Sequence, residues 1–172
     1  MGHHSRSKGV RKWGMSKILF LDFDGVLNSK SWTPPPGVDP TLVLVPTHEQ
    51  SLAMLDPVRC ARVQTLCTAT GASIVFVTGW RRWASPDELT RLLRERGITA
   101  PTLGAVGGVK MSWDIRSYGA KCWLEEHPEV TSHLVIDDVK DYWKGWKGST
   151  IHPDDGIEDS HVAQAIEILN RA

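Results

Sequence analysis

Two aspartates that follow an apolar run are the residues of this chain best placed to do chemistry. Residues 18–21, Ile-Leu-Phe-Leu, lead into Asp22, Phe23, Asp24 and Gly25. A short, wholly apolar run that ends in a polar turn indicates a parallel strand covered on both faces. Ligands of open α/β sheets bind just outside the carboxyl ends of the strands, so both carboxylates would stand at a site. Two such anions need a cation or a proton between them, and Mg²⁺ prefers oxygen ligands of this kind. Asp22 could also be a nucleophile, because carboxylates form aspartyl-phosphates in some enzymes.

Two more apolar runs end in polar residues of a matching kind. Residues 73–77 lead into Thr78, and residues 133–136 lead into Asp137 and Asp138. Right-handed parallel crossovers bring the carboxyl ends of such strands to one edge of the sheet. We therefore expect these three strand ends to converge on a single site, and this convergence is a stronger signal than any one motif.

Helical patterns alternate with these runs. Asp56-Pro57 and the capping box Ser85-Pro86-Asp87-Glu88 are start signals, and Gly71 and Gly97 are stop signals. Further helices are predicted over about residues 115–126 and after a cap at Asp159 or Ser160, and further short strands within 98–106 and 149–152. The alternation predicts an α/β fold with a parallel sheet and helices on both faces.

The string Asp22-Phe23-Asp24-Gly25-Val26-Leu27 resembles motif I of the haloacid-dehalogenase-like (HAD) phosphohydrolases. The resemblance implies a three-layer α/β/α Rossmann-like HAD fold and a Mg²⁺ cofactor. It makes Asp22 the nucleophile and Asp24 the general acid and base, with Asp22 and the backbone carbonyl of Asp24 on the metal. A solvated acidic turn is the plain alternative for a lone Asp-x-Asp.

The other two strand ends resemble further motifs of this family. Thr78 matches motif II, whose hydroxyl would donate a hydrogen bond to a phosphoryl oxygen, although a strand-end threonine can equally bond to the backbone. Asp137 and Asp138 match motif IV and would complete the Mg²⁺ shell; which of the two binds the metal directly is left open.

The family's motif III is a basic residue on the helix before motif IV, and two candidates are open here. Arg116 opens the predicted helix and Lys121 lies further along it, with Lys110 as a weaker third option. The order of a basic residue, Trp123-Leu124, residues 127–129 and then motif IV resembles the HAD subgroup associated with RNA-repair enzymes. In that subgroup the basic residue lies near Arg116, which we favour.

Residues after motif II and motif I bear on the substrate. Gly79 would let the backbone approach an anion, and Arg81 and Arg82 suggest a basic rim that binds substrate. Residues 29–50 are rich in proline and predict a flap over the site rather than a cap domain, so the enzyme would be capless or minimally capped. Trp32 would either contact substrate or attach this flap to the rest of the domain, and we favour the second role.

Composition limits the remaining possibilities. Of 172 residues, 20 are Lys or Arg and 20 are Asp or Glu, so the formal net charge is zero and nothing in the bulk charge demands a polyanionic partner. Three cysteines without metal spacing suit a reducing, cytoplasmic setting. No apolar stretch is long enough to span a membrane. Residues 1–14 read as a disordered tag or leader ahead of a single domain over 15–172.

These observations together predict a Mg²⁺-dependent phosphatase that hydrolyses a phosphomonoester through an aspartyl-phosphate. The substrate would be a nucleotide or a polynucleotide 3′-phosphate end, and no obligate protein partner is evident. A non-catalytic HAD-like binding module is the alternative from a different class.

Overall fold

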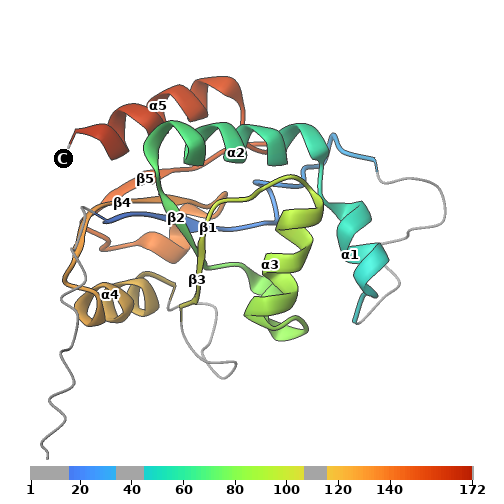
Figure 1. Ribbon diagram of the computed structural model, residues 1–172, viewed down its shortest axis with the longest axis horizontal. Coiled ribbons are helices and arrows are strands. Elements are labelled where there is room, and N and C mark those ends of the chain that lie inside the picture. Colours follow the sequence, from blue (N-terminus) through green and yellow to red (C-terminus); the bar gives the residue numbers. More distant parts are fainter. Residues whose placement is uncertain (1–15, 34–44, 107–115, 172) are drawn as a thin grey trace, which may run out of the picture.

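Five parallel strands form one sheet in the computed structural model, which describes residues 16–33, 45–106 and 116–171 (Figure 1). The strand order is β3-β2-β1-β4-β5, with β1 in the centre. The strands are β1 (Ser16–Leu21), β2 (Ser73–Phe76), β3 (Thr102–Ala105), β4 (Val130–Ile136) and β5 (Ser149–Ile151). Residues 1–14, the possible strand at 42–45 and the loop at 107–113 lie outside the described residues.

Helices cover both faces of this sheet, which confirms the three-layer α/β/α fold class. α2 and α5 lie on one face and α4 lies on the other (Figure 1). The helical elements are α1 (His48–Met54), α2 (Pro57–Thr70), η1 (Gly79–Arg82), α3 (Pro86–Glu95), α4 (Arg116–Glu126), η3 (Lys140–Trp143) and α5 (Asp159–Asn170).

Alternate residues of the central strand point into two separate cores. Leu19 and Leu21 belong to the cluster that lies under α2, α3 and α5, whereas Ile18 and Phe20 belong to the cluster under α4 and η3. All four side chains are at most 1% exposed. Because side chains of a strand alternate between faces, a strand buried on both sides must be apolar at every position, and this is why the run is continuous.

The direction of the chain reverses at β1. The chain first builds outward through β2 and β3, then crosses back to place β4 on the other side of β1. The main chain stays paired beyond the strands: the Asp22 amide donates to the Ile136 carbonyl (3.0 Å) and the Val77 amide donates to the Leu21 carbonyl (3.1 Å). The carboxyl ends of β1 and β4 thus lie side by side at the switch point, where sheets of this kind bind ligands.

The predicted helix boundaries are confirmed where capping signals were clear. Asp56 caps α2 by accepting from the Val58 amide (2.8 Å), and Gly71 ends this helix in the left-handed conformation. The Ser85–Glu88 capping box opens α3. The N-cap of α5 lies at Glu158, at least one residue before the expected cap at Asp159 or Ser160.

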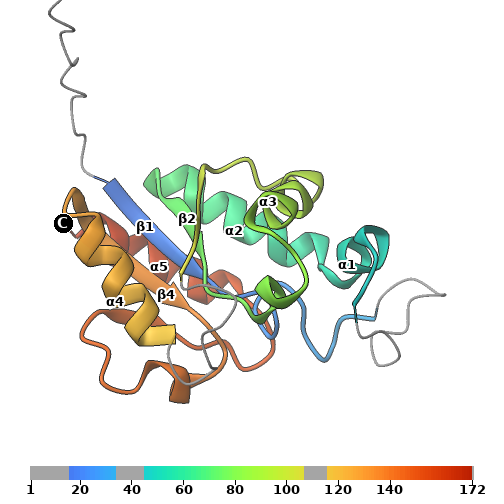
Figure 2. The ribbon, with the colours of Figure 1, turned by 90° about the horizontal axis from the view of Figure 1, so that it is seen from below.

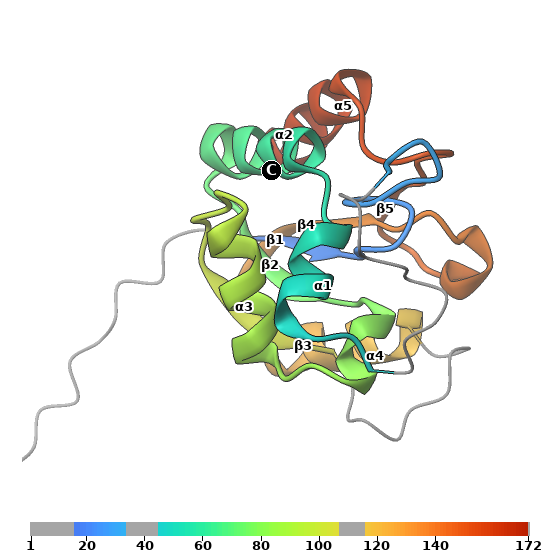
Figure 3. The same ribbon diagram turned by 90° about the vertical axis from the view of Figure 1, so that its right-hand side faces the viewer.

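One helix was missed. Residues 29–50 were predicted to form a flap, but α1 begins within this range, at His48. A capping box between Thr47 and Gln50 starts this helix. α1 lies in front of the carboxyl edge of the sheet (Figure 3) and contacts α3, with His48 beside Glu95. Trp32 is pinned to this helix, since its indole N–H donates to the Ala53 carbonyl (3.2 Å).

Within the described ranges, none of the helices combines the length and the apolar character needed to cross a bilayer.

Candidate active site

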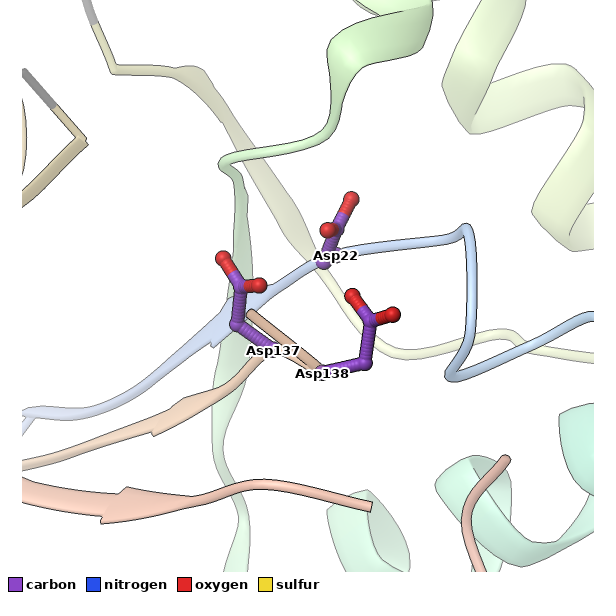
Figure 4. A group of neighbouring side chains, drawn as sticks. All are labelled: Asp22, Asp137 and Asp138. Atoms are coloured by element: carbon purple, nitrogen blue, oxygen red, sulfur yellow. The ribbon is translucent and has the colours of Figure 1, made fainter. Parts of the chain in front are cut away.

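Three carboxylates converge at the switch point between β1 and β4. Side-chain oxygens of Asp22, Asp137 and Asp138 lie within 4.8 Å of one another, and the three side chains project to the same side of the chain (Figure 4). Asp22 and Asp137 are 1% and 0% exposed, whereas Asp138 is exposed. The convergence expected from the strand ends is therefore present in the structure.

Arg116 joins the two buried carboxylates. Its Nη1 donates to Asp22 Oδ2 and to Asp137 Oδ2, the latter at 2.5 Å. The guanidinium is itself buried, and it lies over the ring of Tyr142 at 4.5 Å from the ring centre. Arg116 is the first residue of α4, so this helix places its cation at the sheet edge.

Burial and crowding change the proton affinities of the cluster. Burial, with a further contribution from Asp137, raises the pKa of Asp22 from 3.8 to about 8, even though Arg116 opposes the change. Burial and Asp137 also raise the pKa of Asp138. Burial alone would lower the pKa of Arg116, but the Asp22 and Asp137 carboxylates more than offset this and raise it.

The two acids at the end of β4 have different surroundings. Asp137 accepts at Oδ1 from the Val139 amide (2.9 Å) and at Oδ2 from Trp143 Nε1 (2.8 Å) as well as from Arg116. The Asp138 carboxylate receives no hydrogen bond from another described residue and lies against Gly25. A Cβ placed on Gly25 would be 2.3 Å from Asp138 Oδ2, so the close approach needs glycine, which also has a φ of +68°.

Asp24 is held from two sides. Its Oδ1 accepts from Trp80 Nε1 (2.9 Å) and from Asn28 Nδ2 (2.9 Å), while Oδ2 has no hydrogen bond to the described residues. Asn28 Oδ1 in turn accepts from the Gly25 amide (3.0 Å). The Asp24 side chain is exposed and is not one of the three clustered carboxylates; its predicted contact with a metal was through the backbone carbonyl.

The segment after β2 brings a hydroxyl and a second guanidinium toward the site. Thr78 is fully buried and its Oγ1 accepts from the Trp80 amide (3.3 Å), which caps η1. Gly79 begins η1, and Arg81 Nε donates to the Thr78 carbonyl (2.7 Å). Burial and the nearby Arg116 lower the pKa of Arg81, which places two guanidinium groups in one electrostatic neighbourhood.

Two other predicted residues lie away from the carboxylates. Lys121 is 69% exposed and pairs with Glu125 (3.8 Å). It follows Arg116 by five residues, which turns it roughly 140° around an α-helix, so the two cannot face the same site. Arg82 is exposed on η1. Of the two candidates for the basic residue of motif III, the structure brings Arg116 to the cluster.

Sequence reasoning missed the side chains that hold the acids in place. Trp80 and Trp143 each donate an indole N–H to an aspartate, and Tyr142 covers Arg116. Asn28 was missed as well. Sequence spacing does not indicate which tryptophans donate hydrogen bonds at a site. The only available signal was that a buried indole N–H needs an acceptor.

The donor set fits a hard divalent cation. Three carboxylates cluster around one guanidinium, which bridges Asp22 and Asp137. Burial first, and then the charge of Asp137, raises the pKa of Asp22 and of Asp138, so a bound cation would stabilise their ionised forms. Asp138 offers oxygens that no described donor occupies. Oxygen-only ligands at a substrate site are the set that Mg²⁺ prefers.

The fold and the site define a HAD-type α/β domain. A family model described as the HAD domain in Swiss Army Knife RNA repair proteins matches residues 18–162, well over half of the chain. The chain belongs to this family. Searches of curated proteins and of solved structures found no match.

Proposed function

We propose that this protein is a Mg²⁺-dependent phosphatase that hydrolyses a phosphomonoester through an aspartyl-phosphate on Asp22. The observation that carries the proposal is the position of Asp22: it is buried at the switch point, bonded to Arg116, and within reach of two further carboxylates. A purely structural role would leave this concentration of negative charge without a purpose, because buried like charges are costly.

Asp22 and Asp24 divide the chemistry. An Asp22 oxygen attacks phosphorus, the bond from phosphorus to the leaving oxygen breaks, and Asp24 gives that oxygen a proton. Asp24 then takes a proton from water, which attacks phosphorus and releases phosphate and free Asp22. The hydrogen bonds from Trp80 and Asn28 leave Asp24 Oδ2 available for both transfers.

Two basic groups bind the transferring phosphoryl. Arg81 is desolvated without a carboxylate partner among the described residues, and its charge is felt at Asp22. Arg116 already holds Asp22, so a phosphoryl on that carboxylate would lie near both guanidinium groups. Thr78 can still donate its hydroxyl proton while its oxygen caps η1, and Gly79 leaves room for an anion.

Asp22, Asp138 and the backbone carbonyl of Asp24 would hold Mg²⁺. The ion supplies charge neutralisation for the phosphoryl group when bound. We assign Asp138 rather than Asp137 as the direct ligand, because Asp137 is fully buried and accepts from three donors, whereas Asp138 is exposed and accepts from no other described residue. The role of Asp137 is then to position Arg116.

The family favours a nucleic-acid substrate. Its description names RNA repair proteins, and on this ground we propose a polynucleotide 3′-phosphate end rather than a free nucleotide as the substrate. The cytoplasmic location and the lack of an obligate protein partner stay predictions.

The experiment measures Mg²⁺-dependent phosphate release from an aryl phosphate and from a 3′-phosphorylated oligonucleotide. Asp22→Asn is compared with Asp154→Asn, an exposed aspartate outside the cluster. We expect turnover that requires Mg²⁺, is lost in the first variant and is unchanged in the second. Absence of turnover on both substrates would instead favour the non-catalytic binding module.

A further inference from the structure

A second cavity lies on the α4 face of the sheet, outside the carboxylate cluster. It has a volume of about 540 Å³, within the range of small-molecule sites, and is lined by residues of α4, of β4 and of the segment that joins β4 to β5. Figure 2 shows α4 beside this segment. The residues that give it chemical character are Tyr118, Lys121, His133, Lys144, Trp146 and Lys147.

The rim of this cavity is cationic, and none of the described residues that line it is acidic. Lys121 and Lys144 pair with Glu125 (3.8 Å) and Asp141 (3.1 Å), both outside the lining. These pairs are exposed at both partners and therefore weak, so either lysine can turn to an anionic ligand. Lys147 is exposed.

The floor of the cavity is aromatic. Trp146 packs edge-on against Phe20 (6.2 Å between ring centres) and against His133 (5.5 Å). A Cβ on Gly148 would be 2.5 Å from His133 Nε2 and 2.7 Å from Trp146 Nε1, so the two rings close the floor only because residue 148 has no side chain. Burial lowers the pKa of His133, which keeps this ring neutral. Tyr118 stands at the edge with 58% of its surface exposed.

The cavity shares two structural elements with the carboxylate cluster. Tyr118 lies in the first turn of α4, two residues after Arg116. Trp143 donates to Asp137 and packs against Trp146, with 5.4 Å between ring centres. The cavity and the cluster thus share α4 and are linked by the contact between Trp143 and Trp146.

We propose that this cavity binds a nucleotide of a single-stranded polynucleotide whose 3′-phosphate end occupies the carboxylate site. The proposal rests on the phosphatase function proposed above. A neutral aromatic floor suits a base, and a lysine rim suits the backbone phosphates; stacking platforms flanked by cations are how single strands are bound. An acidic, tyrosine-containing peptide is the competing occupant. We favour the polynucleotide because the cavity shares α4 with the carboxylate site proposed for its 3′-phosphate end.

The test uses two variants on the exposed part of the cavity, Tyr118→Ala and Lys147→Ala. Matched controls are Leu103→Ala, an exposed apolar residue of β3, and Arg94→Ala, an exposed cation of α3. The substrates are an aryl phosphate and a 3′-phosphorylated RNA of about ten nucleotides. Binding is measured in parallel by fluorescence anisotropy with the same RNA ending in a 3′-hydroxyl.

We expect each cavity variant to lower kcat/KM for the RNA, and its binding, by roughly tenfold, with aryl phosphate turnover unchanged. Lys147→Ala should also reduce the salt dependence of RNA binding by about one charge. Neither control should change either quantity.

Unchanged RNA turnover and binding in both cavity variants would overturn the proposal, as would an equal loss on both substrates. Binding of an acidic, tyrosine-containing peptide that both cavity variants weaken, with RNA affinity unaffected by them, would overturn the proposal and assign the cavity to a protein partner. If the wild type hydrolyses neither substrate, the phosphatase function fails, and the anisotropy of the 3′-hydroxyl RNA still decides the cavity.

Discussion

The ends of β1 and β4 each carry one buried and one exposed aspartate, yet the described donors are shared unequally between the two acids at β4 and equally at β1. At β4 the buried Asp137 accepts from three donors, and the exposed Asp138 accepts from none of the described neighbours. At β1 the exposed Asp24 is held by two side chains, and the buried Asp22 accepts only from Arg116 and from the Phe23 amide (2.8 Å).

This difference shows how similar residues acquire separate tasks. A carboxylate that accepts from three donors, as Asp137 does, is fixed and becomes a positioning group. A carboxylate with fewer donors keeps lone pairs that can bind a cation or attack phosphorus. Asp22 adds a further feature, because burial raises its pKa and makes its charged form costly without a cation. The proposed mechanism therefore requires that the aspartates at the two strand ends differ in their hydrogen bonds.

The largest expected effect comes from removing the cation between the two buried acids. Arg116→Gln leaves Asp22 and Asp137 uncompensated, which should lower the free energy of unfolding by about 3–5 kcal/mol and phosphate release by about 10²- to 10³-fold. Lys121→Gln is the matched control. Its exposed pair with Glu125 predicts a change within about 0.5 kcal/mol, measured by denaturant unfolding and steady-state kinetics. Equal effects of the two variants would contradict the assignment of Arg116.

The pair at the end of β4 should separate metal binding from stability. Asp138→Asn is expected to raise the Mg²⁺ concentration for half-maximal activity at least about tenfold with little change in stability. Asp137→Asn places an amide group among three N–H donors, so its NH₂ must face at least one of them, and the variant should cost about 1–3 kcal/mol of stability with a smaller shift in the Mg²⁺ requirement. A Mg²⁺ titration and thermal unfolding of both variants check this, and the reverse pattern would exchange the two roles.

The contact between the two strand ends can be tested at Gly25. Gly25→Ala and Gly71→Ala introduce the same strain, since φ is +68° and +72°, and each should cost about 1–2 kcal/mol of stability. Only the first puts a Cβ against Asp138, so it alone should lower activity, by at least about tenfold. If kinetics show no difference between the two variants, the approach of Gly25 to Asp138 has no part in function.

A smaller effect concerns pH. The folded state raises the pKa of Asp22 from 3.8 to about 8, so it holds a proton more tightly than the unfolded chain does. In metal-free protein the free energy of unfolding should therefore fall as pH rises through this interval. Mg²⁺ binds the ionised carboxylates. At ten times its Kd at pH 8 it should raise the free energy of unfolding by about 1.4 kcal/mol at that pH, and the same concentration should raise it less at pH 6. Thermal unfolding with EDTA or Mg²⁺ measures this, and Asp22→Asn should have a flatter pH profile. An equal Mg²⁺ effect at both pH values would contradict the raised pKa.

The features that could be predicted from the sequence were the strands and helix boundaries that depend on short stretches of residues. The continuous apolar run before Asp22 requires a doubly buried strand, and the cap at Asp56 and the Ser85–Glu88 box mark helix starts through contacts within four residues. α1 carried a similar signal at Thr47 and Gln50, but the proline-rich stretch before it drew the prediction toward a flap.

The supporting contacts of the site could not be predicted in the same way. Trp80 reaches Asp24 across 56 residues, and Arg116 reaches Asp22 across 94. Such contacts depend on how helices dock on the sheet rather than on local pattern. The choice between Arg116 and Lys121 was open in the sequence because it depends on the rotation of α4, which its packing decides.

The most direct test of the central role of Asp22 is chemical trapping of the acyl phosphate. Enzyme in steady-state turnover with Mg²⁺ is quenched in acid, reduced with borohydride, which converts an aspartyl-phosphate to homoserine, and mapped by peptide mass spectrometry. The account predicts homoserine at position 22, dependent on substrate and Mg²⁺ and absent in Asp22→Asn. Homoserine at position 24, 137 or 138 instead, or none during demonstrated turnover, would contradict it.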